Sequence, residues 1–202
     1  MSVKSIIIAV ITMLALAAGG YYYFAYPPTL YKRIAQHALD DFGRAIATKD
    51  RAKISDGLKK LLADPIHIRL EVRYFSILQQ GAKPMVEEFD KAGFAAFIDN
   101  ILYSLQDYAY SAEVQEFKLS DDKKSADLTF SQTAWGDGIS YYAGTGANVR
   151  FYTDTLCAGK VFFEGKKATL GDVVCKTELA TLPKEGEENK LRNPEAIREI
   201  MR

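Results

Sequence analysis

Between Met1 and Tyr31, Lys4 is the only ionisable side chain other than tyrosine. The chain from Ile6 to Tyr26 is apolar and carries no charge. A helix of roughly 20 apolar residues matches a bilayer hydrocarbon core of about 30 Å. The run therefore predicts a transmembrane or signal helix, with contact to the membrane through Ile6 to Tyr26, and sets residues 1–28 apart from the rest of the chain.

Two interpretations of this run stay open. As an uncleaved anchor it ends in several tyrosines, at the level of an aromatic belt, and Pro27 and Pro28 then end the helix. As a signal peptide it offers Lys4 as a positive n-region and Ala15-Leu16-Ala17 as a cleavage site. Both interpretations export the domain that follows.

Two opposing signals bear on which side of the membrane the domain lies. Lys32, Arg33 and Arg44 outnumber Lys4, and the positive-inside bias alone would leave the domain in the cytoplasm. The short positive tail before an apolar run and the cysteines favour export. We therefore expect a single-pass protein of a bacterial inner membrane with its domain in the periplasm, or a periplasmic protein if the segment is cleaved.

Cys157 and Cys175 are the only cysteines, and they flank a predicted hairpin. Counting outward from a three-residue turn at residues 165–167 sets the two directly opposite each other, within disulfide reach. A disulfide of this loop size contributes up to about 3 kcal/mol and persists in an oxidising compartment. The alternative is two buried free thiols in a cytosolic domain.

Composition bounds the function. About 170 residues follow the apolar run, enough for one domain with one core. Acidic and basic residues balance at 26 each, which argues against nucleic acid as a partner. His37 and His67 lie far from the cysteines in sequence and match no zinc spacing, so we expect neither a metal nor a cofactor.

The apolar periodicity predicts helices first and strands afterwards. Residues 30–46 form an amphipathic helix, Asp50 caps a second, short helix, and residues 66–74 alternate as a half-buried strand. A third helix is expected over residues 85–107. Further predicted strands cover residues 110–119, 125–135, 139–143, 149–164 and 168–179, with a turn at Asp137-Gly138 and a short tail helix at 194–201.

This order resembles the nuclear transport factor 2-like superfamily. The cues are Asp50 followed by Ile54, Leu58, Leu61 and Ile66, and Ser125-Ala126-Asp127 opening a meander strand. The resemblance implies an α+β fold in which helices pack on a curved antiparallel sheet that forms a cone with a pocket at its wide end. We expect this domain over residues 29–182, and a polar tail over residues 183–202.

The resemblance also suggests candidates for chemistry inside the cone. An isomerase of this superfamily uses a carboxylate base and a tyrosine or protonated acid as donor. Asp99 and Tyr103, one helical turn apart, supply these types, although a surface or packing role is the simpler interpretation. Trp135, Tyr141, Tyr142 and Tyr152 are the candidates for lining a site for an apolar ligand.

Arg69, Glu71 and Arg73 form a charged stripe on one face of the strand at residues 66–74. A solvated face explains this stripe, and so does a docking surface for a partner. We predict a non-catalytic interaction or assembly module of the cell envelope, with an envelope protein or a second copy of the chain as partner. The alternatives are a binding protein for an apolar small molecule or lipid, and an isomerase-like or dehydratase-like enzyme.

Overall fold

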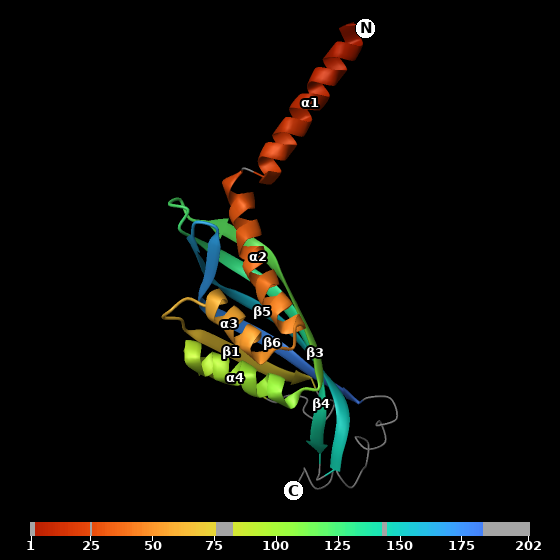
Figure 1. Ribbon diagram of the computed structural model, residues 1–202, viewed down its shortest axis with the longest axis vertical. Coiled ribbons are helices and arrows are strands. Elements are labelled where there is room, and N and C mark those ends of the chain that lie inside the picture. Colours follow the sequence, from red (N-terminus) through yellow and green to blue (C-terminus); the bar gives the residue numbers. More distant parts are fainter. Residues whose placement is uncertain (1–2, 25, 76–82, 143–144, 184–202) are drawn as a thin grey trace.

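The computed structural model describes residues 3–24, 26–75, 83–142 and 145–183 (Figure 1). The polar tail and its predicted short helix at residues 194–201 lie outside this part. The elements in chain order are α1 (Val3–Phe24), α2 (Pro27–Ala47), α3 (Arg51–Leu61), β1 (Ile68–Phe75), β2 (Met85–Phe89), α4 (Lys91–Ser104), β3 (Asp107–Leu119), β4 (Ser125–Tyr142), β5 (Thr145–Glu164) and β6 (Lys167–Pro183).

The expected α+β arrangement is confirmed, with α2, α3 and α4 on one face of a curved sheet (Figure 1). The amphipathic helices α2 and α3 both bury the predicted faces. The Asp50 carboxylate caps α3 by accepting a hydrogen bond of 2.9 Å from the Ala52 amide. Inner side chains of the sheet and of these helices form one core, which includes Leu39, Phe42, Ile54, Leu58, Ile68, Val114, Leu128, Phe130, Val161 and Leu170.

The sheet is mixed, whereas an antiparallel sheet was predicted. Its strand order is β2-β1-β6-β5-β4-β3, and β1 runs parallel to β6. The reason lies at the start of β1, where the His67 amide donates to the Asp172 carboxylate at 2.8 Å and the Val173 amide donates to the His67 carbonyl at 3.0 Å. These bonds fix β1 beside β6 and in the same direction.

The third helix is shorter than predicted. Met85–Phe89 forms the edge strand β2, antiparallel to β1, and only Lys91–Ser104 is helical. Asp90 separates the two, because its carboxylate accepts a hydrogen bond of 2.7 Å from the Gly93 amide and so begins the helix there.

The predicted turn at Asp137-Gly138 is wrong, since β4 continues through it to Tyr142. The glycines in this part of β4 allow neighbouring side chains to pack closely against the strand. A Cβ atom on Gly136 would lie 2.5 Å from Leu105 Cδ1, so the missing side chain makes room for the residue that ends α4. In addition, the Asp137 carbonyl accepts a hydrogen bond of 2.7 Å from the Gln106 amide, which holds this part of β4 against the start of β3.

The N-terminal apolar run forms α1, which leaves the domain and points away from the sheet (Figure 1). Among its side chains that the structure describes, the large apolar ones are exposed, as Leu14 at 65% and Leu16 at 71% illustrate. In the part of the chain that the structure describes, none of the helices is both long and apolar enough to cross a membrane. The transmembrane segment predicted between Ile6 and Tyr26 is thus not supported by the structure.

Candidate functional site

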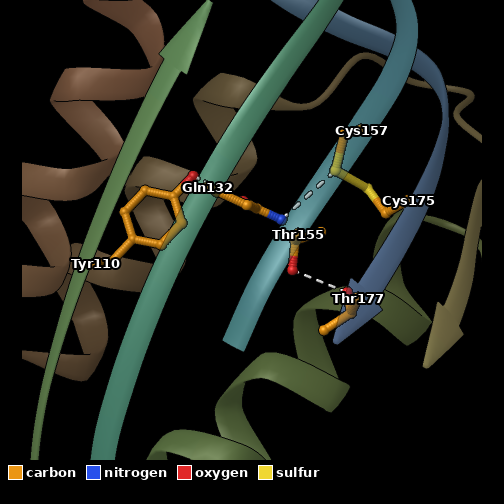
Figure 2. Close-up of a disulfide and its surroundings, with 6 residues drawn as sticks. All are labelled: Tyr110, Gln132, Thr155, Cys157, Cys175 and Thr177. Atoms are coloured by element: carbon orange, nitrogen blue, oxygen red, sulfur yellow. Dashed lines mark hydrogen bonds between the residues drawn. A yellow bond between two sulfur atoms is a disulfide. The ribbon is translucent and has the colours of Figure 1, made fainter. Parts of the chain in front are cut away.

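The predicted disulfide is present, and it lies inside the core. Cys157 and Cys175 face each other across β5 and β6 with 4.1 Å between their Cα atoms. Cys157 is fully buried and Cys175 is 7% exposed. The Gln132 side-chain amide donates to the Cys157 sulfur at 3.5 Å (Figure 2).

The register that pairs the cysteines arises differently from the prediction. The hairpin turn consists of Gly165 and Lys166, so that Glu164 pairs with Lys167. Continued without interruption, this register would set Cys157 opposite Val174. A β-bulge between Gly159 and Val161 shifts the pairing by one residue and brings Cys175 opposite Cys157.

Two glycines allow this bulge to form without steric clashes. A Cβ atom on Gly159 would lie 2.4 Å from the Asp172 carbonyl oxygen, and one on Gly171 would lie 2.5 Å from the Phe162 ring. The bulge also carries the Asp172 carboxylate that binds the His67 amide. It therefore sets both the disulfide register and the position of β1.

Beside the disulfide lies a network of polar side chains inside the cone (Figure 2). The Tyr110 hydroxyl donates to the Gln132 side-chain oxygen at 2.9 Å, and the Thr155 and Thr177 hydroxyls lie 2.9 Å apart. Burial raises the pKa of Tyr110 above its usual range, so its phenol stays protonated at neutral pH. Sequence reasoning missed this network, which depends on cross-strand register.

Two of the aromatic candidates lie on the outer face of the sheet. Side chains alternate along a strand, and Thr155 and Cys157 point into the core, so Tyr152 points outward. Trp135 is directly opposite Tyr152 in the β4–β5 pairing and shares that face. An apolar ligand inside the cone would therefore not touch them. Tyr141 and Tyr142 belong to β4, and their side chains lie outside the described part.

Arg150 joins these outer aromatics into a cluster that the sequence did not reveal. Its guanidinium donates to both carboxylate oxygens of Asp137, at 2.7 and 2.9 Å, and lies 4.4 Å from the centre of the Trp135 ring. Hydrogen bonding to Asp137 is the main cause that raises the pKa of Arg150 above its ordinary value, and hydrogen bonding to Tyr152 is the second cause. Asp137 is 5% exposed because this cluster covers it.

The predicted charged stripe Arg69, Glu71 and Arg73 is also on the outer face. Arg69 lies 3.7 Å from Glu88 on the edge strand, and Arg73 lies 3.5 Å from Glu71. On the other side, Glu71 is opposite Lys176 and Arg73 is opposite Glu178. The charges extend across three strands, and the exposed apolar side chains of Val174 and Leu156 lie next to them.

The candidate catalytic residues, Asp99 and Tyr103, lie on α4 beside α3. The Arg51 guanidinium forms an ion pair with Asp99, with one hydrogen bond of 2.8 Å, and lies 5.3 Å from the centre of the Tyr103 ring. This hydrogen bond holds the pKa of Asp99 below its ordinary value. A carboxylate so stabilised is a weak general base at neutral pH.

Asp99 and Arg51 also line a groove of about 280 Å³ between α3 and α4. Its walls are mainly apolar and include Ile54, Leu58, Ala95, Ile98 and Leu102. Among the described residues, no group of three or more His, Cys, Asp or Glu side chains could hold a metal ion.

No family model matches the chain, and no curated protein matches it. Among solved structures, LinA matches with a TM-score of 0.47 and 11% identity, over 78% of this chain and 92% of that chain. Hexachlorocyclohexane dehydrochlorinase LinA-type3 from Novosphingobium barchaimii LL02 matches with a TM-score of 0.44 and 10% identity, over 77% and 94%. The Kfla4162 protein from Kribbella flavida matches with a TM-score of 0.43 and 14% identity, over 69% and 87%. At such scores and identities, these likenesses carry no argument about the activity of this chain.

Proposed function

We propose that this chain is a non-catalytic interaction module of the bacterial cell envelope, with its domain in the periplasm and the apolar run from Ile6 to Tyr26 tethering it to the inner membrane. The observation that supports the non-catalytic part is that side chains pack against one another in the described core of the cone. Phe42 packs edge to face on Tyr110 at 5.4 Å, and Phe130 and the disulfide occupy the adjoining core. Tyr110, the buried phenol, donates to an amide rather than to a reacting group.

The proposed location is supported by the disulfide and by the apolar run. A disulfide persists in an oxidising compartment such as the periplasm. The run from Ile6 to Tyr26 follows a single lysine, in the order of an export signal. Cleavage after Ala17 would release the same domain into the same compartment.

Thiol labelling in intact cells tests the location. After these cells are lysed and the protein is denatured, we expect Cys157 and Cys175 to resist a maleimide reagent, because oxidised sulfur has no thiolate. Both cysteines should react fully once a reductant is added. Fractionation of the same cells separates a tethered chain from a released one. Labelling of both cysteines without reductant would overturn the exported location.

The proposed contact surface is the charged stripe on the outer face of the sheet. Charged groups of alternating sign select a partner of complementary pattern and raise the association rate. Val174 and Leu156 supply apolar area beside the charges. The partner is an envelope protein or a second copy of the chain.

Partner recovery from membranes tests this surface. Arg69→Ala with Arg73→Ala should lower the recovery of the cross-linked partner by about three- to tenfold, since both cations of the stripe are lost. The matched control, Lys53→Ala with Lys59→Ala on α3, removes the same charge away from the stripe and should recover the partner normally. Co-expression of two differently tagged copies identifies a homodimer. Equal recovery in all variants would contradict the proposal.

Binding of an apolar small molecule is the second candidate function, and the groove between α3 and α4 favours it. The groove has about 280 Å³, next to the lower limit of about 300 Å³ for ligand pockets. Its rim carries the ion pair of Arg51 with Asp99, which would hold a polar group of the ligand. The lowered pKa of Asp99 supports binding at this rim more than proton abstraction.

A further inference from the structure

Three segments distant in sequence meet at the end of the domain from which α1 departs (Figure 1). They are the start of α2, the β3–β4 turn at residues 120–124 and the β5–β6 turn at residues 164–167. The Phe163 amide donates to the Lys124 carbonyl at 2.8 Å, which joins the two turns. The rings of Tyr31 and Phe163 pack edge to face at 4.8 Å, which joins the turns to α2.

These two turns present four exposed lysines, Lys123, Lys124, Lys166 and Lys167, which we name the basic end. One of the nearby carboxylates, that of Asp122, is engaged within its own turn. Asp122 accepts hydrogen bonds from the Ser120 hydroxyl at 2.6 Å and from the Lys124 amide at 3.0 Å.

The bond from Ser120 is the main cause that lowers the pKa of Asp122, and the carboxylate stays turned toward its own loop. Glu164 lies opposite Lys167 in the ladder, and Asp121 is the remaining acid of the two turns. The lysines therefore outnumber the acids at this end, and the excess charge is presented to solvent.

Apolar and aromatic side chains lie beside these lysines. Leu30, Tyr31 and Ile34 of α2 line a hollow of about 380 Å³ against Gly165 and Lys166, with His37 on its wall. Leu30 is 37% exposed.

The end of α1 next to this hollow exposes Tyr21 and Tyr22, and Tyr26 follows them before α2. Tyrosines at the level of the headgroups, flanked by lysines, are the composition that proteins place at a membrane interface.

We propose that the basic end docks on the anionic phospholipid headgroups of a membrane, an inference that rests on the tether in the proposed function. Lysines near an anionic leaflet are attracted to its headgroups. Docking orients the domain with its basic end on the bilayer. The charged stripe on β1 and the groove between α3 and α4 then face the aqueous compartment.

Lysine footprinting of the full chain in vesicles tests this orientation. The chain is reconstituted into phosphatidylcholine vesicles with or without phosphatidylglycerol, treated with a water-soluble acetylating reagent and analysed by mass spectrometry. We expect acetylation of the four lysines to fall by about threefold when phosphatidylglycerol is present. This protection should disappear in ~0.5 M salt, which screens the attraction. Lys53 and Lys59 should react equally in both vesicles.

A charge variant makes the test specific. In Lys123→Gln with Lys166→Gln and Lys167→Gln, the remaining Lys124 should lose its protection. The matched control, Lys53→Gln with Lys59→Gln and Lys60→Gln on α3, should keep Lys124 protected. A chain that stays with the vesicles but is acetylated equally in both would overturn the docking and leave the tether intact. A chain recovered in the supernatant would overturn the tether, and the docking with it.

Discussion

Replacing Gly159 by alanine should lower the free energy of unfolding by about 3 kcal/mol, at the upper end of single substitutions. The new Cβ atom would lie 2.4 Å from the Asp172 carbonyl oxygen and 3.1 Å from the Val173 Cα atom. Both are backbone atoms of the bulge, and the His67 hydrogen bonds hold them in place. Denaturant unfolding followed by circular dichroism measures the loss.

The same variant should form less disulfide. When the bulge is disfavoured, the continuous register sets Cys157 opposite Val174 and turns Cys175 to the other face. Titration of thiols in denatured, unreduced protein measures this. The control is Gly43→Ala on α2, whose Cβ would make an ordinary contact of 3.5 Å with Tyr110. It should be neutral or stabilising by up to about 1 kcal/mol. Similar stability of both variants would refute the role given to the bulge.

Removing the disulfide should have a comparable effect. Cys157→Ala with Cys175→Ala should lower the free energy of unfolding by about 3 kcal/mol, because a cross-link over 18 residues limits the unfolded chain. Alanine is preferred to serine, since both sites lie in the core and a hydroxyl there would need a partner. The midpoint of urea unfolding reports the change.

A reductant separates this effect from simple loss of packing. Wild-type protein unfolded in the presence of dithiothreitol should approach the midpoint of the double alanine variant. The variant itself should be insensitive to dithiothreitol. If reductant leaves the wild-type midpoint unchanged, the disulfide does not stabilise the domain.

Local sequence patterns were sufficient to predict much of the fold. Helical spacing predicted the buried faces of α2 and α3, and Asp50 has the capping role assigned to it. The cysteine pair was predicted correctly although its turn was not. A two-residue turn and one bulge give the same register at Cys157 as the assumed three-residue turn. The bulge depends on contacts of Asp172 with His67, which no local pattern encodes.

Features set by distant neighbours were predicted wrongly or missed. The strand Met85–Phe89 forms because β1 supplies its hydrogen-bond partners, and its few residues also fitted a helical period. The parallel pairing of β1 with β6 has no local signature. Trp135 and Tyr152 were expected in the cone, although alternation counted from Cys157 places Tyr152 on the other face. The Arg150–Asp137 pair needs the β4–β5 register, which only the assembled sheet provides.

The pairing of β1 with β6 also bears on how the chain folds as it is made. Ile68 of β1 pairs with Val173 of β6, so the first of the described strands waits until the last of them has left the ribosome. Contacts of such long sequence separation form slowly. Until then, β1 has only the short edge strand β2 beside it, and Cys157 has no partner. Completion of β6 is therefore the step that both closes the sheet and allows oxidation.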